Sequence, residues 1–307
     1  IFHGNLIEQL RYGENPHQIG GVYSKQENMG IKQVHGKQLS YNNYNDIFSA
    51  LAISKALPKN IGTVIIKHAN PCGVSIKKNP INSYRSALAC DPISAFGGIV
   101  SCNFKITKNL AVELNKLFLE VIIANNFEIN ALKILKKKKN LRLIDASNYS
   151  LDNTFKIISS NNDVLVQSED FKKFSHKDFK VVSKRKPSSK EMKNLIFAFN
   201  VCRFVKSNAI VLVKNKQLIG IGCGQTSRID ALKQAIEKAK KFKFDLKNCV
   251  MASDAFFPFP DCVKVAHEAG ISAVIQPGGS LKDQLSIDYC DKNKISMVMT
   301  GIRHFKH

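Results

Sequence analysis

The pair Lys67-His68 stands where an apolar run, residues 64–66, comes to an end. An imidazole can accept a proton, and a neighbouring ammonium disfavours its protonated form. The ammonium of Lys67 could in turn donate a hydrogen bond to an oxygen that gains negative charge during a reaction. Ligands of open α/β sheets bind beyond the carboxyl ends of strands, where this pair is expected to lie.

Both side chains can reach one pocket only if the strand has already ended, because successive strand residues face opposite sides of a sheet. The following Asn70-Pro71 predicts such a break. The ordinary alternative is structural, since one histidine at a strand end is more often structural than catalytic.

Three further segments carry groups suited to binding. Residues 220–228, GIGCGQTSR, predict a glycine-rich turn that could approach a ligand, with Arg228 at a helix N-terminus. They match neither a dinucleotide fingerprint nor a Walker loop. Residues 253–261, SDAFFPFPD, suit a core, although a ring there could stack on a planar heterocycle. Residues 11–18, RYGENPHQ, form a polar loop that could bind an anion. Each segment alone also has a purely structural explanation.

The cysteines do not form a metal-binding pattern. A zinc deaminase needs H-x-E and P-C-x-x-C, and Pro71-Cys72 is followed by Gly-Val-Ser, so the second cysteine is absent. No metal is predicted. The eight cysteines are scattered without any C-x-x-C, which in a chain of this length predicts reduced thiols and a cytoplasmic location rather than disulfides.

The chain is strongly basic, with a formal net charge of +22 over 307 residues. Such a charge could indicate a nucleic-acid or membrane partner. However, the basic residues are seven arginines and 39 lysines spread along the chain, and no RNA-binding box or helix-turn-helix pattern accompanies them. No apolar run approaches the roughly 18–20 residues that span a bilayer. We therefore predict no nucleic-acid or membrane partner, while an anionic small substrate suits the charge. The N-terminus has no secretory pattern and begins at Ile1, so upstream sequence is expected.

Alternating strand-like and helix-like segments predict an α/β fold with a largely parallel or mixed sheet covered by helices. The expected strands are 63–67, 97–103, 119–124, 141–145, 249–254, 273–276 and 295–301, with a hairpin over 209–224 that turns at Lys214-Asn215. The expected helices are 46–57, 82–91, 107–118, 127–139, 188–208, 228–242, 261–269 and 281–292. Residues 146–187 are polar and predict a crossover. We divide the chain into a first lobe, 1–150, and a connecting region with a second lobe, 151–307.

Nine collinear segments resemble one enzyme family. They are RYGENPHQ, KHANPCGV, DPISAFGGIV, FLEVIIA, KSNAIVL, GIGCGQTSRIDA, SDAFFPFPDCV, QPGGSLKDQ and TGIRHFKH. In order and over essentially the whole chain, they resemble the AICAR formyltransferase part of the bifunctional purine biosynthesis enzymes, where AICAR is 5-aminoimidazole-4-carboxamide ribonucleotide. The resemblance implies two lobes of cytidine-deaminase-like three-layer fold without zinc, and a homodimer with sites at the interface. It also implies an IMP cyclohydrolase domain upstream, outside this chain.

The same resemblance implies the reaction and its residues. A formyl group would pass from 10-formyltetrahydrofolate, the co-substrate, to the 5-amino group of AICAR. The implied catalytic residues are Lys67, His68 and Asn208; the implied substrate-binding residues are Arg11, Tyr12, Gly97, Glu120, Arg228, Phe256 and Arg303.

The roles of the three catalytic residues are only partly separable from the sequence. A neutral His68 can take the proton of the amine as its nitrogen attacks the formyl carbon. Lys67 and Asn208 can stabilise the tetrahedral oxygen or protonate the leaving folate nitrogen, and both assignments stay open. Two other functions compete with this one: a basic ribonucleotide- or RNA-binding protein without catalysis, which the intact three residues disfavour, and another folate-dependent transferase.

Overall fold

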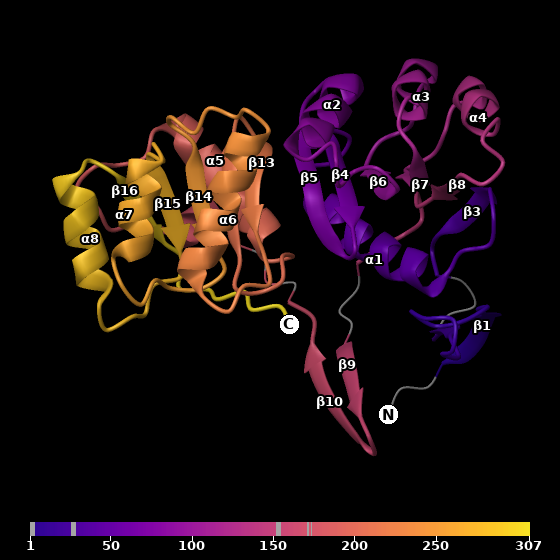
Figure 1. The fold of residues 1–307 in the computed structure, drawn as a ribbon, viewed down its shortest axis with the longest axis horizontal. Coiled ribbons are helices and arrows are strands. Elements are labelled where there is room, and N and C mark those ends of the chain that lie inside the picture. The colour runs from indigo at the N-terminus through magenta and orange to yellow at the C-terminus, as the bar shows by residue number, and fades with distance from the viewer. Residues whose placement is uncertain (1–3, 26–28, 152–154, 171, 173) are drawn as a thin grey trace.

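The computed structural model describes residues 4–25, 29–151, 155–170, 172 and 174–307. Two lobes lie side by side, one containing helices α1 to α4 and the other α5 to α8 (Figure 1). The first lobe contains β1 (Asn5–Gln9), β2 (Gly21–Ser24), β3 (Lys32–His35), α1 (Tyr41–Ala56), β4 (Gly62–Lys67), β5 (Asn70–Ile76), α2 (Pro80–Cys90), β6 (Gly98–Cys102), α3 (Lys108–Asn115), β7 (Leu119–Ala124), α4 (Ile129–Leu135) and β8 (Arg142–Asp145). The rest contains β9 (Phe155–Ser160), β10 (Asp163–Ser168), a 3-10 turn (His176–Asp178), β11 (Lys180–Val181), α5 (Ser189–Cys202), β12 (Ile210–Lys214), β13 (Gln217–Gly222), α6 (Arg228–Lys241), β14 (Val250–Ser253), α7 (Asp261–Glu268), β15 (Ala273–Gln276), α8 (Asp283–Lys292) and β16 (Ser296–Met299).

A mixed 12-stranded sheet runs through both lobes in the order β11-β16-β15-β14-β12-β13-β5-β4-β6-β7-β8-β3. The lobes join where β13 pairs with β5 at Gln217 and Ser75. Strands next to this junction pair antiparallel, whereas β6-β7-β8 and β14-β15-β16 pair parallel. The predicted α/β class and mixed sheet are confirmed.

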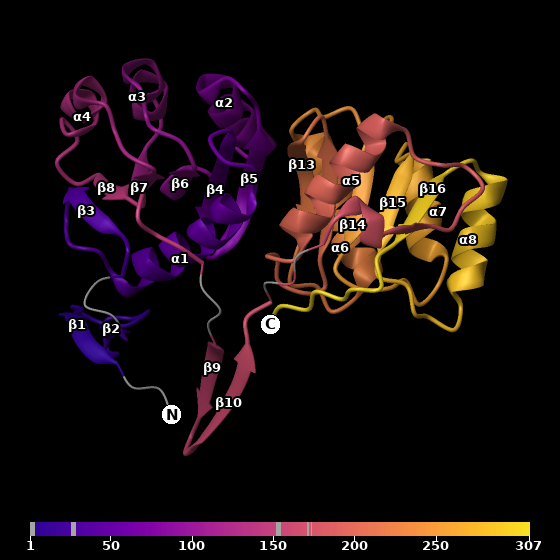
Figure 2. The same cartoon turned by 180° about the vertical axis from the view of Figure 1, so that it is seen from behind.

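The two lobes repeat the same order of helices and strands, although the sequence shows no residue-level repeat. Each contains a helix and a β-hairpin (α1, β4, β5; α5, β12, β13), followed by three strands that are each preceded by a helix. From the junction outwards the sheet reads β5-β4-β6-β7-β8 on one side and β13-β12-β14-β15-β16 on the other. Helices α1 and α5 pack into one core shared by both lobes, while α2–α4 and α6–α8 cover the opposite faces (Figures 1 and 2). Each lobe is therefore a three-layer helix–sheet–helix sandwich.

Side-chain caps determine where α1 and α5 begin. The hydroxyl of Ser40 accepts the N–H of Asn43, and the Asn43 carboxamide accepts the N–H of Ser40, which together satisfy two free helix N–H groups. Ser188 and Glu191 make the same reciprocal pair at α5, whose start agrees with the helix predicted from residue 188. Helix α1 therefore starts ahead of the predicted Asp46, which lies on its second turn.

The predicted end of the strand before His68 is confirmed, because β4 ends at Lys67, but the turn does not lie at Asn70-Pro71. The chain reverses at His68 and Ala69, whose φ angles are 51° and 58°, and β5 begins at Asn70. Proline lacks a backbone donor and is usually excluded from paired strands unless they bulge. Here the β4–β5 register shifts between Ile65 and Ile66, beside Pro71, so the proline is accommodated at an irregularity.

The region predicted as a polar crossover contains a long hairpin. Strands β9 and β10 pair antiparallel from Phe155–Ser168 to Ser160–Asp163 and project away from both lobes (Figures 1 and 2). Its apolar side chains are exposed: Phe155, Ile157, Ile158, Val164, Leu165 and Val166. An isolated two-stranded hairpin is marginally stable in water. The exposed apolar surface is therefore suited to contact with another chain.

A buried ion pair links the lobes beside the shared core. Asp91, which follows α2, is 2% exposed and lies 2.5 Å from the ammonium of Lys238 on α6. Burial alone would raise the pKa of Asp91, but Lys238 and the hydrogen bonds from Ser94 outweigh it and lower that pKa. The carboxylate therefore favours the folded state above its unfolded pKa of about 3.9 and loses this contribution as the pH falls through its lower folded pKa.

We predict that Lys238→Met lowers the free energy of unfolding at pH 7 by roughly 2–4 kcal/mol. The change leaves the buried Asp91 carboxylate without its partner, and the cost lies somewhat below that of a fully buried pair because Lys238 is 30% exposed. Urea unfolding measures the change. Lys240→Met, an exposed position on the same helix, removes the same charge and should stay within about 0.5 kcal/mol of wild type. Equal effects of the two substitutions would contradict a role for the pair.

Candidate active site

A polar pocket of about 610 Å³ opens in the first lobe. Six of the ten sequence-predicted site residues line it: Arg11, Tyr12, Lys67, His68, Gly97 and Glu120. They come from the loop after β1, the β4–β5 turn, the start of β6 and the start of β7. Strand β4 runs antiparallel to β5 and β6, so the pocket lies at the end of β4 but at the beginnings of β6 and β7. The predicted position of the Lys67-His68 pair at the carboxyl end of a strand is confirmed for β4, although the parallel strands β6 and β7 begin, rather than end, at the pocket.

Lys67 is held at the last position of β4. Its ammonium donates to the carbonyl oxygens of Gly97, at 2.9 Å, and Phe96, at 3.3 Å. An ammonium has three N–H groups, so one remains for a ligand. Gly97 has a φ of 65°, and a Cβ added there would lie 3.2 Å from the Lys67 nitrogen. The positive φ thus favours glycine, and any Cβ there would push the Lys67 ammonium slightly away from its present position.

His68 leaves the strand at the first position of the turn. Its side chain is exposed, and no residue in the described part of the chain hydrogen-bonds to its ring, so both nitrogens are available. The turn is anchored because the N–H of Ala69 donates to the Asp46 carboxylate at 2.6 Å. Burial raises the pKa of Asp46, against the effects of the turn N–H groups, His68 and Lys67. Helix α1 therefore positions the turn that carries the candidate base.

The far side of the pocket combines a carboxylate with arginines. Glu120 accepts a hydrogen bond from Asn43 at 3.0 Å and lies 3.9 Å from the guanidinium of Arg142. Burial lowers the pKa of Arg142, and the positive charge of Arg11 acts in the same direction. The Arg11 guanidinium lies 5.6 Å from the ring centroid of Tyr12. Arg11 and Arg142 thus place positive charge close together.

Eleven lining residues were not among the predicted site residues, and four of them matter most for the charges and contacts of the pocket: Asn43, Asp46, Arg142 and Lys206. Asp46 and Asn43 looked like ordinary residues at the start of a helix. Arg142 carried one usable signal, its rarity as one of seven arginines in a lysine-rich chain. Lys206 comes from the second lobe.

The other four predicted residues gather in a second-lobe cluster and do not line this pocket. The carboxamide of Asn208 accepts from Arg228 at 2.6 Å, and Arg228 also donates to the carbonyl of Phe256 at 3.3 Å. Arg303 lies next to this group, because the N–H of the following His304 donates to the carbonyl of Asp254 at 3.0 Å. The structure thus places the ten residues in two groups, six and four.

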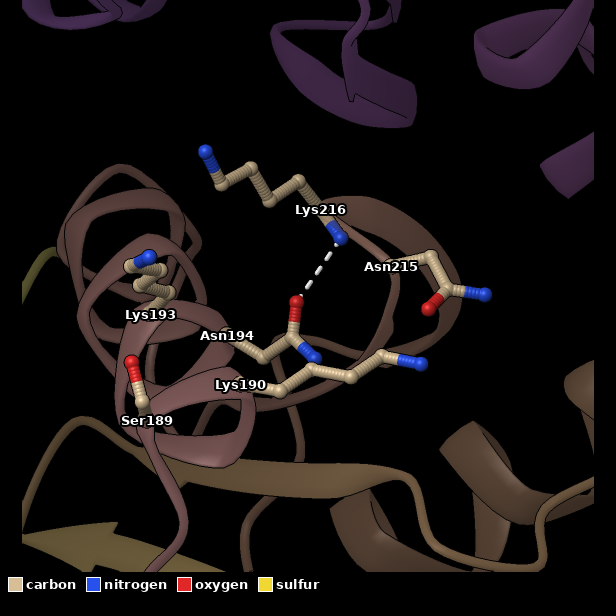
Figure 3. A pocket seen from close by; sticks show the side chains of 6 residues that line it. All are labelled: Ser189, Lys190, Lys193, Asn194, Asn215 and Lys216. Carbon is tan, nitrogen blue, oxygen red and sulfur yellow. Dashed lines mark hydrogen bonds between the residues drawn. The ribbon is translucent and has the colours of Figure 1, made fainter.

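The second lobe has its own counterpart of the pocket, about 450 Å³ in volume (Figure 3). Its β12–β13 turn, Asn215-Lys216, has φ angles of 53° and 55°, and the N–H of Lys216 donates to Asn194 on α5 at 2.8 Å. Asn215 occupies the position of His68 and cannot act as a base. Figure 3 shows the ammonium groups of Lys190, Lys193 and Lys216 pointing in different directions. Of these two equivalent turns, the one in the first lobe carries an imidazole and the one in the second lobe does not.

The chain is thus a two-lobed α/β protein with a polar pocket that bears an imidazole and an ammonium, and comparison with known proteins identifies its family. The model of the AICARFT/IMPCHase bienzyme family matches residues 2–238, and the chain belongs to this family. It is 49% identical over 99% of its length to the bifunctional purine biosynthesis protein PurH of Bacteroides thetaiotaomicron, and 46% identical over 98% to that of Aquifex aeolicus. The chain spans 59% and 60% of those two proteins.

One solved structure shows a weak similarity. It is a diaminohydroxyphosphoribosylaminopyrimidine deaminase/5-amino-6-(5-phosphoribosylamino)uracil reductase from Thermotoga maritima, with 20% identity, 35% of this chain and 34% of that chain covered, and a TM-score of 0.25. A score that low does not indicate a shared fold.

The described residues were also searched for metal sites, reactive cysteines and membrane-spanning helices. They contain no group of three or more His, Cys, Asp or Glu side chains placed to hold a metal ion. All eight cysteines are free thiols, and seven are buried. Burial raises the pKa of the Cys72 and Cys102 thiols to about 12, so both are poor nucleophiles at neutral pH. Within the described ranges, no helix is long and apolar enough to span a membrane.

Proposed function

We propose that this chain transfers a formyl group from 10-formyltetrahydrofolate to the 5-amino group of AICAR, giving formyl-AICAR and tetrahydrofolate in the biosynthesis of IMP. The observation that carries the proposal is the first-lobe pocket, which gathers six residues that the family resemblance had assigned to substrate or chemistry. Membership of the family supports the same reaction. The free, buried thiols suit a cytoplasmic location.

The pocket chemistry suits this reaction. The 5-amino group is a poor nucleophile, because its lone pair is delocalised into the imidazole and the carboxamide. His68 would accept a proton from this nitrogen as the bond to the formyl carbon forms. Lys67, fixed by two carbonyl oxygens with one N–H free, would donate that N–H to the formyl oxygen as negative charge develops there. Arg11 and Arg303 would bind the phosphate, since a guanidinium can bind phosphate through two parallel hydrogen bonds.

The pocket and the second-lobe cluster need to meet if all ten residues act together. We propose that they meet across a homodimer, in which the pocket of one subunit receives the second-lobe cluster of the other. The exposed apolar hairpin β9–β10 supports such an assembly, because a second chain would cover its surface.

We predict that His68→Ala lowers kcat by roughly 10²- to 10⁴-fold, the usual contribution of a positioned general base. The dissociation constant for AICAR should change much less, because the base acts mainly in the transition state. Steady-state kinetics and calorimetry measure these quantities. A near-normal kcat in a well-folded His68→Ala protein would return the residue to a structural role.

Subunit mixing tests where the two groups of residues meet. His68→Ala and Asn208→Ala homodimers should each be nearly inactive. If sites form between subunits, a heterodimer of the two variants contains one site with both residues intact, so co-expression should restore a substantial part of the wild-type activity. Two differently tagged copies of His68→Ala form the matched control. Failure of an isolated heterodimer to recover activity would place both residues in one chain's site.

The hairpin provides an independent test of the dimer. We predict that Leu165→Lys combined with Val166→Lys weakens dimerisation, because a charge in an apolar interface is costly to desolvate. Sedimentation equilibrium should show dissociation at a higher protein concentration than in the wild type. Lys156→Glu, on the paired strand, is a polar-for-polar control. A wild-type protein that is monomeric and fully active would exclude the dimer altogether.

A further inference from the structure

The side chain of Asn208 has no donor left for a substrate. Its carboxamide nitrogen donates to the carbonyl oxygens of Gln225, at 2.9 Å, and Thr226, at 3.1 Å. A carboxamide nitrogen carries two N–H groups, so both are used. The adjoining backbone N–H of Asn208 donates to the Gln225 carbonyl as well.

The oxygen of the same carboxamide faces the opposite way. It accepts one N–H from Arg228 at 2.6 Å and keeps a second lone pair. The reverse orientation would bring this oxygen against two carbonyl oxygens and the amide N–H groups against a guanidinium. The surrounding hydrogen bonds therefore allow one orientation of the carboxamide.

A buried carboxylate fixes Arg228. Asp254 is fully buried and accepts from Arg228 at 2.9 Å, while its other oxygen accepts from the hydroxyl of Ser207 at 2.6 Å. The Arg228 side chain is only 10% exposed, so solvent screens its charge weakly. Asp254 thus holds both Arg228 and the residue before Asn208, and Arg228 polarises the Asn208 oxygen.

Building on the proposed formyl transfer, we infer that Asn208 acts as a hydrogen-bond acceptor for the 5-amino group of AICAR, and that Arg228 and Asp254 are positioning residues for that acceptor. The amine has two N–H groups. One faces His68, which removes its proton, and the other is held by the Asn208 oxygen, which directs the nitrogen lone pair at the formyl carbon.

The acceptor is most effective in the transition state. As the nitrogen–carbon bond forms, the amine nitrogen becomes more positive and its N–H groups become better donors, so the hydrogen bond to Asn208 strengthens. His68 takes the amine proton, the bond from the formyl carbon to the folate nitrogen breaks, and that nitrogen takes up the proton that His68 had accepted. Since Asn208 cannot donate, Lys67 is the donor to the formyl oxygen. This resolves the alternatives that the sequence left open.

The test compares two ligands in the absence of folate. AICAR and imidazole-4-carboxamide ribonucleotide, which carries hydrogen in place of the 5-amino group, are titrated by calorimetry into wild-type protein and Asn208→Ala. The wild type should bind AICAR roughly five- to tenfold more tightly than the analogue, the usual effect of one hydrogen bond. Asn208→Ala should bring this ratio close to one while leaving the affinity for the analogue unchanged.

Asp254→Asn provides a second variant that keeps the shape of the side chain. It should reduce the AICAR-to-analogue ratio and lower kcat without weakening analogue binding, whereas a merely structural role would change only the melting temperature. Asp245→Asn, at an exposed carboxylate paired with Lys214, is the matched control and should preserve the ratio.

Three outcomes distinguish the possibilities. A ratio that collapses in Asn208→Ala supports the acceptor role. A ratio that stays at the wild-type value in both Asn208→Ala and Asp254→Asn overturns it, and so does an equal loss of affinity for the two ligands. If the wild-type protein binds neither ribonucleotide, the proposed formyl transfer itself fails, and the inference that rests on it fails as well.

Discussion

The hydrogen bond from the N–H of Ala69 to the carboxylate of Asp46 connects the candidate chemistry to the rest of the fold. His68 and Ala69 both have positive φ angles, a conformation that costs non-glycine residues of order 1 kcal/mol or more each. The β4–β5 ladder on one side and helix α1 on the other hold the turn in that conformation. In return, Lys67 keeps the orientation of a strand residue while His68 leaves the strand, so both side chains reach one pocket.

The second lobe contains an equivalent hairpin turn anchored to a helix, but with different side chains. Asn194 replaces Asp46 as the acceptor on the helix, and Lys216 replaces Ala69 as the donor in the turn. The capping boxes at Ser40 and Ser188 start the two helices in the same way, so that each helix presents its acceptor to its turn. The backbone arrangement has thus been kept in both lobes, while the side chain that can act as a base is present in one.

Local chemistry made several elements predictable from sequence. Strands β4 and β7 and the start of helix α5 lie where their patterns indicated, because apolar runs and hydroxyl caps act over a few residues. The end of α5 was misplaced, since the helix stops at Cys202 and not at the predicted 208. The turn lies at His68 and Ala69, and the sequence placed it at Asn70-Pro71, which is normally a strong turn signal. The proline is admitted to β5 where the register with β4 skips Cys72 of the same strand. The hairpin β9–β10 was missed because its strands lack the regular alternation of apolar and polar residues that marks a half-buried strand.

The site residues likewise divide into those recognisable from local sequence and those that depend on distant contacts. Lys67, His68 and Gly97 could be recognised from short motifs, whereas Asp46, Arg142 and Asp254 act through partners far away in the chain. Asp254 meets Ser207 and Arg228 only after the second lobe has folded, and no spacing in the sequence encodes that contact. Family resemblance identified Asn208, but the direction of its hydrogen bonds required the positions of Gln225 and Thr226.

The distribution of arginine clarifies what the large positive charge does. Arg11 and Arg142 line the pocket, and Arg228 holds Asn208, although the chain has few arginines and many lysines. A guanidinium is planar and stays charged when buried, whereas lysine is a flexible point charge better suited to a solvated surface. Two of the pocket carboxylates are already engaged, Asp46 by the turn and Glu120 by Asn43 and Arg142. The positive charge left over in the pocket is therefore available to an anionic ligand, and such a ligand can be recognised without any role for the lysines on the outer surface.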